Sequence, residues 1–280
     1  MVSIYNKPSM LFDLTKCIGC RACQVACKRW NNRPAEETSL SADAENQWTN
    51  PSTLSYKTWR LVKFKLNYDE DNDEINWTFI PWSCMHCNDP PCLGVCPTKA
   101  VYQREDGIVH IHSDRCIGCG YCVQACPYKV RFFGDDEYFG LKSVYKCTYC
   151  LDRLDAGLAE TACVQSCPTG ALEFGEKNEM HEKARERALA VGGFVFGDET
   201  TSPGGEDIGT TSVYVSKVPF DELDFPTEEQ RISAPFVMER ILLERGGLAI
   251  FGLGMLSFIG FALWRRERID KAKMREALKV

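Results

Sequence analysis

Hydrophobic and polar side chains alternate most clearly in the segment Thr58–Leu66, where lysines separate three apolar residues: Val62, Phe64 and Leu66. Successive side chains of a strand point to opposite faces, so this alternation predicts a strand with one buried face. The acidic segment Asp69–Glu74 follows, and Ile75–Trp82 is again apolar and aromatic. We therefore predict a β-hairpin whose turn is the acidic segment.

Weaker patterns predict the remaining elements. Gly107–His112 and Thr211–Val218 have the composition of short strands. Lys177–Ala190 is rich in helix-forming residues and predicts a helix. Gly192–Gly209, rich in Gly, Thr and Ser, predicts a loop, and the acidic Phe220–Ala234, which contains proline, predicts a linker. Helices and strands together indicate an α+β fold.

The longest apolar stretch, Gly246–Trp264, holds 19 residues without a charge. As a helix it would be roughly 28 Å long, close to the bilayer core of about 30 Å. Charged residues stand on both sides of the stretch, and Trp264 has the position of an interface anchor. A buried core helix is the alternative, but we predict one C-terminal transmembrane helix in contact with membrane lipid.

Charge differs between the two sides of this stretch. Arg265–Val280 carries seven Lys and Arg against three Asp and Glu, whereas the remaining residues carry 26 basic and 36 acidic groups. Basic residues tend to stay cytoplasmic, so we expect a cytoplasmic tail and an acidic domain on the opposite, periplasmic side. Met1–Asp13 lacks the features of a secretory signal, so export would need a partner that carries one. The acidic balance argues against nucleic-acid binding.

Cysteine dominates the candidate chemistry. The sixteen cysteines form four groups of four, and two groups have the spacing Cys-x2-Cys-x2-Cys-x3-Cys, with which bacterial ferredoxins hold 4Fe–4S clusters. We therefore predict four 4Fe–4S clusters, each held by four thiolates. The groups are Cys17, Cys20, Cys23 and Cys27; Cys84, Cys87, Cys92 and Cys96; Cys116, Cys119, Cys122 and Cys126; and Cys147, Cys150, Cys163 and Cys167.

Two other uses of the cysteines fit the pattern less well. Disulfide scaffolds do not repeat a Cys-x-x-Cys-x-x-Cys run. Structural zinc sites usually take their ligands from separated Cys-x2-Cys pairs, whereas here the third and fourth cysteines continue the run. A zinc-binding structural module is therefore the alternative from a different functional class.

The cysteine motifs repeat along the chain. The segments Cys17–Cys27 and Cys116–Cys126 are near copies, whereas Cys84–Cys96 and Cys147–Cys167 contain longer spacers. Proline follows the fourth cysteine in three motifs, but Lys28 stands there in the first. In a ferredoxin-like repeat, three cysteines hold one cluster, and the fourth starts a short helix and reaches the partner cluster. Four repeats therefore predict two ferredoxin-like modules.

Five stretches carry a resemblance to a known family: Cys17–Cys27 with Trp30-Asn31, Lys57–Phe64, Cys84–Cys92, Val144–Arg153 and Cys163–Gly170. They resemble the four-cluster iron–sulfur subunits of molybdopterin oxidoreductases, and within that family the β subunit of membrane-bound formate dehydrogenase. The resemblance runs from about residue 11 to residue 264. It implies two ferredoxin-like double-cluster modules with an inserted hairpin and one C-terminal transmembrane helix.

The resemblance also implies that the ligands cross between motifs, the first pairing with the fourth and the second with the third. The implied ligand sets are Cys17, Cys20, Cys23 and Cys167; Cys147, Cys150, Cys163 and Cys27; Cys84, Cys87, Cys92 and Cys126; and Cys116, Cys119, Cys122 and Cys96.

The function that the resemblance implies is an electron relay without catalysis of its own. Its partners would be a catalytic α subunit with a molybdenum or tungsten pterin and a membrane cytochrome b or quinone-reactive γ subunit. Electrons from formate would pass through the clusters toward quinone. The alternatives are the same role in a hydrogenase, polysulfide reductase or nitrate reductase complex. No catalytic triad, phosphate loop or carboxylate pair stands out in the sequence.

The expected domain organisation follows from these features. Residues 1–175 would form the tandem cluster domain, with 28–83 inserted as a covering segment. Residues 176–245 would be an extension and linker, 246–264 the transmembrane helix and 265–280 the basic tail.

Other polar residues lie beside the motifs. Basic side chains there would offset the negative charge of a cluster, unless they are simply solvated: Lys16, Arg21, Lys28, Arg115, Lys129 and Lys146. Gly19 and Gly118 would let backbone amides approach the clusters, or would only make tight turns. His86 could ligate iron, but cysteines already supply four ligands for each cluster, and we expect His110 and His112 to be strand residues.

Overall fold

The computed structural model describes residues 5–39, 48–69, 74–138, 141–198 and 209–227, together with the helical residues 256–257, 260 and 263–264. Residues 1–233 form one compact unit, and residues 234–280 form a second. All sixteen cysteines lie in the first unit and carry free thiols.

The largest sheet described in the first unit has four strands. Its strand order is β8 (Leu172–Glu176), β1 (Pro8–Asp13), β10 (Ser212–Ser216) and β9 (Phe194–Phe196). Strand β1 runs parallel to β10 and antiparallel to β8. The sheet therefore joins strands from both sides of residue 175, where the sequence places the end of the cluster domain.

Helix α6 (Lys177–Val191) covers one face of this sheet and confirms the helix expected at Lys177–Ala190. Ala184 and Ala188 are buried against Leu11, Val213 and Val215 of the sheet. Small side chains on the helix allow it to approach the strands closely. The helix ends at Gly192, whose φ of 65° gives the left-handed C-cap that glycine favours.

Two β-hairpins extend from the unit. Strands β2 (Leu61–Asp69) and β3 (Glu74–Trp82) pair antiparallel and confirm the predicted hairpin, whose turn at 70–73 lies outside the described residues. Strands β6 (Phe132–Tyr138) and β7 (Leu141–Tyr145) form a second hairpin that the sequence analysis missed. The predicted strand at Gly107–His112 is present as β5 (Val109–Ile111), which pairs with β4 (Val101–Gln103).

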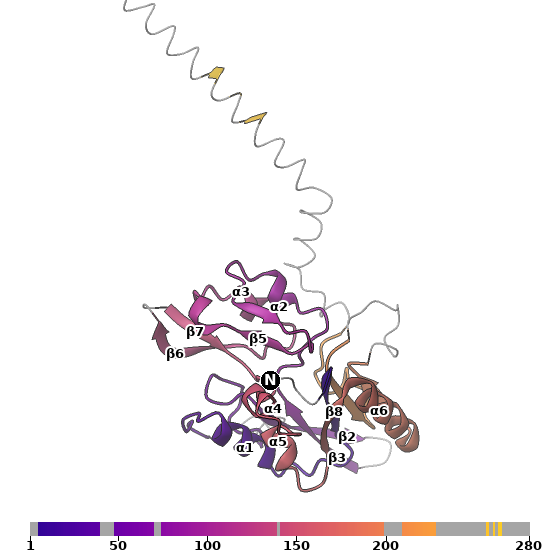
Figure 1. Ribbon diagram of the computed structural model, residues 1–280. Coiled ribbons are helices and arrows are strands. Elements are labelled where there is room, and N and C mark those ends of the chain that lie inside the picture. Colours follow the sequence, from indigo (N-terminus) through magenta and orange to yellow (C-terminus); the bar gives the residue numbers. More distant parts are fainter. Residues whose placement is uncertain are drawn as a thin grey trace, which may run out of the picture. The chain divides into compact units, whose positions relative to one another are not determined.

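Each cysteine motif includes one short helix: α1 (Ala22–Trp30), α2 (Pro91–Gly94), α3 (Tyr121–Gln124) or α5 (Ala162–Gln165). Two further short elements are helix α4 (Leu151–Asp155) and a 3-10 turn at Ser113–Arg115. Helix α1 packs on α5, and α2 packs on α3. These pairs bring the first motif to the fourth and the second to the third, giving two modules on separate sides of the unit (Figure 1).

The expectation that the fourth cysteine starts a helix is wrong. Each short helix instead contains the third cysteine, and in α2, α3 and α5 the helix ends before the fourth. Proline follows those three fourth cysteines, and a residue before proline is pushed out of the helical conformation. Lys28 follows Cys27 instead, so α1 continues through Cys27 to Trp30.

Parts of the segments expected to be a loop and a linker belong to the sheet or the core. Phe194–Phe196 of the expected loop is strand β9. Leu223 and Phe225 of the expected linker are buried, and the Phe225 ring meets Trp82 edge-on at 4.8 Å. Residues 199–208 and 228–234 lie outside the described residues. The apolar side chains of the expected linker therefore pack against the core, although the sequence around them is acidic.

The predicted transmembrane stretch, 246–264, lies almost entirely outside the described residues. The five residues of it that are described are helical: Leu256, Ser257, Gly260, Leu263 and Trp264. Within the part of the chain that the structure describes, no helix is long and apolar enough to cross a membrane.

Candidate metal centres

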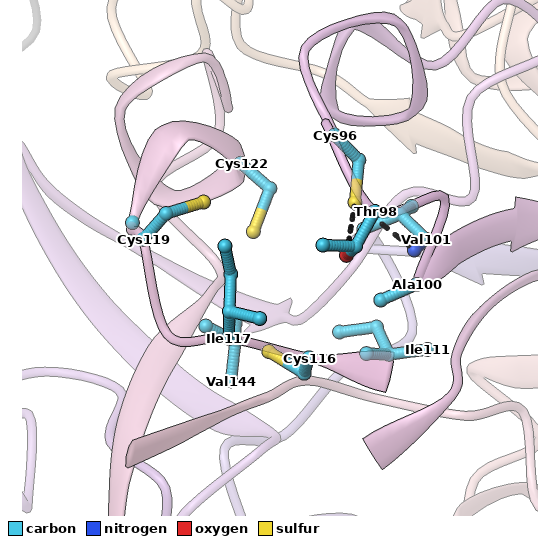
Figure 2. A pocket seen from close by; sticks show the side chains of 11 residues that line it. Cys96, Thr98, Ala100, Val101, Ile111, Cys116, Ile117, Cys119, Cys122 and Val144 are labelled. Atoms are coloured by element: carbon cyan, nitrogen blue, oxygen red, sulfur yellow. Dashed lines mark hydrogen bonds between the residues drawn. The ribbon is translucent and has the colours of Figure 1, made fainter. Parts of the chain in front are cut away.

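One cavity in the second module is surrounded by four cysteines from two motifs. It is lined by Cys116, Cys119 and Cys122 of the third motif and by Cys96 of the second. Figure 2 shows the four sulfur atoms turned toward the space between them. Apolar side chains, among them Val101 and Ile111, complete the lining. We call this ligand set site 4.

A second cavity in the same module has the complementary composition. It is lined by Cys84, Cys87 and Cys92 of the second motif and by Cys126 of the third. Three prolines, Pro90, Pro91 and Pro127, form part of its wall. We call this set site 3. The two cavities exchange their fourth cysteines, which is the crossing that the family resemblance implies.

The first module groups its thiols in the same way. Burial raises the pKa of Cys27 well above its ordinary value, and the next causes are the nearby thiols of the fourth motif: Cys147, Cys163 and Cys150. The pKa of Cys17 is raised by burial as well, with contributions from Cys167 and Cys20. We call Cys17, Cys20, Cys23 and Cys167 site 1, and Cys27, Cys147, Cys150 and Cys163 site 2.

Neighbouring sites share elements or contacts: α1 carries both Cys23 of site 1 and Cys27 of site 2, and α2 of site 3 packs on α3 of site 4. Burial and then Cys163 of site 2 raise the pKa of Cys23 in site 1, to about 12. The pKa of Cys147 in site 2 is raised mainly by burial and also by Cys84 of site 3. Cys92 of site 3 likewise acts on Cys122 of site 4, whose pKa burial raises. Sites 2 and 3 are therefore the inner pair, and sites 1 and 4 the outer pair.

Exposure follows the same order. Cys20 of site 1 and Cys119 of site 4 are the exposed cysteines, whereas all four cysteines of site 2 are buried. Exposed apolar side chains stand next to each exposed cysteine, with Ile18 at site 1 and Ile117 and Tyr121 at site 4.

Most of the thiols lie in surroundings that oppose ionisation. Burial raises the pKa of Cys150 to about 12 and that of Cys126 to about 11. Cys96 differs, because the Val101 N–H at 3.4 Å and Thr98 donate to its sulfur and lower its pKa although burial acts in the opposite direction (Figure 2). Iron ligates thiolate, so metal binding would supply the positive charge that the buried sulfurs need.

Each module also buries one arginine among its thiols. In the second module, Arg131 is 2% exposed and its Nη2 donates to Cys92 Sγ at 2.7 Å. In the first, Arg60 is 1% exposed and its Nη2 donates to Met10 Sδ at 3.4 Å. Burial lowers the pKa of both guanidinium groups, but the surrounding thiols raise it by more, so both stay charged.

These arginines are the main site residues that the sequence analysis missed. Of the six basic residues that it proposed, only Lys146 is buried among the thiols, at 3% exposure. Arg115 and Lys129 are exposed, and Lys16 forms ion pairs with Asp13 and Glu173. Arg21 lies over the Phe64 ring at 4.7 Å, and Lys28 donates to the Pro34 carbonyl. The sequence signal that could have indicated them is a single charged residue inside an apolar run, as at Val130-Arg131-Phe132.

A β-hairpin packs against each of the two predicted glycine turns, at Gly19 and Gly118. Gly19 and Gly118 have φ of 66° and 64°. A methyl group at Gly118 would lie 2.5 Å from the Lys142 carbonyl oxygen of β7, and one at Gly19 would lie 2.8 Å from Phe79 of β3. The hairpins β2–β3 and β6–β7 therefore cover the outer Cys-Ile-Gly-Cys loops, and any side chain there would push them away.

His86 is fully buried and donates no hydrogen bond in the described structure. Its Nδ1 accepts from the Val109 N–H at 3.2 Å, while its Nε2 has no partner there. Burial, assisted by the Lys146 charge, lowers the pKa of His86 well below its usual range, so the ring is neutral. His110 lies on β5 as expected, and His112 follows that strand.

The donor set fits an anionic metal–thiolate group. Arg60 Nε and Nη1 and Arg131 Nη1 are buried without a partner, and no carboxylate pairs with either side chain in the described structure. A buried cation needs a compensating anion nearby, and a 4Fe–4S cube with four thiolates supplies a charge of about −2. Within the described residues no three His, Cys, Asp or Glu side chains are close enough to share a single metal ion.

Comparison with known proteins identifies the cysteine motifs. Residues 16–100 and 75–177 each match a family described as a 4Fe-4S dicluster domain. These ranges together contain all four motifs.

Named relatives extend over more of the chain. The formate dehydrogenase iron–sulfur subunit of Haemophilus influenzae is 42% identical over 63% of this chain and 54% of its own length. The formate dehydrogenase-O iron–sulfur subunit of Escherichia coli K12 is 43% identical over 65% of this chain and 57% of its own length. The hydrogenase-2 operon protein HybA of Escherichia coli O157:H7 is 32% identical over 78% of this chain and 72% of its own length. The chain thus spans a little over half the length of the two formate dehydrogenase subunits.

Proposed function

This chain belongs to the 4Fe–4S dicluster family that contains the formate dehydrogenase iron–sulfur subunits and HybA, and from that premise we propose that it is an electron-transfer subunit with four 4Fe–4S clusters. The clusters would occupy sites 1 to 4, each held by three cysteines of one motif and one of its partner motif. When bound, they would accept and donate single electrons. The chain's own residues position, shield and charge-balance them.

The linear order of the sites is the observation that carries this proposal. Helix α1 carries ligands of sites 1 and 2, the His86 and Tyr149 rings join the loops of sites 3 and 2, and α2 packs on α3 between sites 3 and 4. Such an arrangement carries electrons across the subunit from one end to the other. Site 2, whose four cysteines are buried, would be shielded from solvent oxidants, while the exposed Cys20 and Cys119 bring the outer sites to the surface.

The outer sites also suit two different partners. We propose that a catalytic subunit with a molybdenum or tungsten pterin docks at one outer site and a membrane cytochrome b or quinone-reactive subunit at the other. Exposed apolar side chains support this, since Ile18 is 59% exposed beside Cys20 and Tyr121 is 55% exposed beside Cys119. Apolar residues at a surface are typical of the core of protein interfaces.

The location proposed for the chain rests on its sequence. The charge-free stretch 246–264 would anchor it in the membrane, with 265–280 in the cytoplasm and the cluster domain on the periplasmic side. Protease added to intact spheroplasts checks this topology. Protection of the cluster domain until the membrane is broken would contradict it.

Formate is the electron source that the relatives favour, and the test is direct. The tagged full chain is purified anaerobically with its partners, and its iron–sulfur signals are followed by electron paramagnetic resonance. Formate should reduce the clusters, and a soluble quinone should then reoxidise them. The similarity to HybA favours a second candidate, a relay for a hydrogenase. Reduction by hydrogen but not by formate would select that candidate, and reduction by neither would reject both.

A further inference from the structure

The four Cys-x-x-Cys loops share a backbone feature at their third residue. The φ angle there is 66° at Gly19, 64° at Gly118, 46° at His86 and 54° at Tyr149. Glycine adopts this left-handed conformation readily, whereas a bulky side chain strains the backbone there. The loops of the outer sites use glycine, but those of the inner sites carry a histidine and a tyrosine.

The two strained residues face each other between the inner sites. The His86 and Tyr149 ring centroids are 3.9 Å apart, with an angle of 31° between the ring planes. Both residues are buried. The Tyr149 hydroxyl shares a hydrogen bond of 2.5 Å with Ser212 Oγ, and the Val109 N–H fixes His86 through Nδ1. The rings therefore form a fixed contact between the Cys84–Cys87 loop of site 3 and the Cys147–Cys150 loop of site 2.

Lys146 lies at the same place. Its Nζ donates to the Val109 carbonyl and, at 2.7 Å, to the Cys147 carbonyl. Val109 thus holds His86 with its N–H and Lys146 with its C=O. No carboxylate pairs with Lys146 in the described part of the chain. Burial lowers the pKa of Lys146, and thiols of both inner sites act in the opposite direction: Cys84, Cys147 and Cys92.

Strained backbone persists only where its surroundings impose it, and it concentrates at functional positions. Here the strain places packed rings and one shared cation between two sites of different modules. We propose that His86, Tyr149 and Lys146 form an inter-module junction that carries electrons between the clusters at sites 2 and 3. This rests on the proposed function, because it requires clusters at both sites.

With clusters bound at both inner sites, one electron would pass from the reduced cluster at one site to the oxidised cluster at the other. No bond forms or breaks and no proton moves. The two packed rings would fill the space between the clusters with protein atoms, and a positive charge on Lys146 would stabilise an added electron on either cluster. Lys146 therefore raises the reduction potentials of both inner clusters.

The role of Lys146 is tested by a redox titration of the cluster-loaded full chain, followed by electron paramagnetic resonance. Lys146→Met should lower the potentials of both inner clusters by about 59 mV or more, a tenfold change in a one-electron equilibrium. The outer clusters should keep their potentials. Lys217→Met, at an exposed residue just after β10, is the matched control and should change none of the four. Unchanged inner potentials in Lys146→Met would overturn this part of the proposal.

The rings are tested by the rate of electron exchange between the modules, measured by rapid-freeze paramagnetic resonance after partial reduction. Tyr149→Gly and His86→Gly suit the backbone but remove a ring, and should slow the exchange by about tenfold or more. Tyr149→Phe keeps the ring and should exchange at the wild-type rate. If a glycine variant loses its clusters, His86→Asn replaces it, because Asn tolerates the left-handed backbone.

If the variants without a ring exchanged electrons between the modules at the wild-type rate, the proposed junction would be rejected. The iron content of the wild-type chain separates this failure from a failure of the proposed function. A wild-type chain without four clusters rejects the proposed function itself. A fully loaded chain whose variants behave as wild type rejects the junction alone.

Discussion

The two modules hold the same pattern of cysteines but surround it with different charges. In the second module, Arg131 donates directly to the sulfur of Cys92. In the first, Arg60 donates to the Met10 thioether, and its guanidinium carbon lies 5.0 Å from the centre of the Phe12 ring. Cysteine spacing thus sets where the ligands lie, while residues between the motifs set the charge that the ligands meet. Hydrogen bonds and charge tune cluster potentials, so the two modules should differ in potential despite their similar ligands.

The largest effect should come from removing a crossed ligand in each module. Cys27→Ala should disrupt the cluster at site 2, and Cys126→Ala the cluster at site 3, with a loss of up to about four iron atoms per chain. Iron analysis and cluster-resolved paramagnetic resonance measure both variants. If Cys27→Ala removed only the site 1 signal, the two modules would not share the crossed arrangement.

The next effect concerns the buried arginines. Removing one partner of a buried charge pair costs about 3–5 kcal/mol, because the other charge stays buried. Arg131→Met should therefore destabilise the cluster-loaded chain by that order and lower the potential at site 3. Arg60→Met should lower the potentials at sites 1 and 2 by less, since no sulfur ligand accepts from Arg60 directly.

Chemical denaturation and potentiometric titration compare the two arginine variants. Arg131→Lys is the control, because it keeps the charge and loses the planar donor geometry. Equal shifts in Arg60→Met and Arg131→Met would show that the direct sulfur contact does not distinguish the modules.

A smaller effect should follow from the helix that only the first module extends. Lys28→Pro places proline inside α1, which costs about 3 kcal/mol in a helix interior. It would also shift Trp30, whose Nε1 donates to Asp152 at 2.8 Å and whose ring lies 4.4 Å from the Arg153 guanidinium. Pro127→Ala in the second module should cost less than about 1 kcal/mol, as α3 already ends before Cys126. Thermal unfolding measures both, and equal losses would reject this explanation of the helix lengths.

The smallest effect is a pH dependence of folding stability that arises in the first covering hairpin, β2–β3. Burial lowers the pKa of Lys63 on β2 to about 8, although Asp224 acts in the opposite direction. The unfolded chain keeps an ordinary lysine pKa of about 10.4 and so binds more protons than the folded chain between these values. Folding stability should therefore rise from about pH 8 to about pH 10.4 through this group. Lys63→Met should flatten that rise, and chemical denaturation at a series of pH values measures it.

Several elements could be predicted because their signals are local. The hairpin β2–β3 follows from alternation, α6 from helix-forming composition and β10 from a run of β-branched residues. The cysteine groups follow from spacing alone. The pairing of motifs into modules came from the family resemblance, and two cavities are lined by cysteines of both the second and the third motif.

The missed features depend on distant partners. Strand β1 is buried at all six positions and shows no alternation, since it lies between β8 and β10, far away in sequence. Hairpin β6–β7 has an irregular register between Phe133 and Glu137 that breaks its pattern. Arg60 and Arg131 are single charges in apolar segments, and only the fold shows that thiols surround them. Sequence therefore finds the ligands more readily than the groups that tune them.

The most direct test of the account is the metal content of the full chain, purified anaerobically with its clusters intact. Four 4Fe–4S clusters predict about sixteen iron atoms and about sixteen acid-labile sulfides per chain, with broad visible absorption and little zinc. A count near eight or twelve would mean that one or two of the four sites hold something else. A colourless protein with zinc in place of iron would contradict the electron relay altogether.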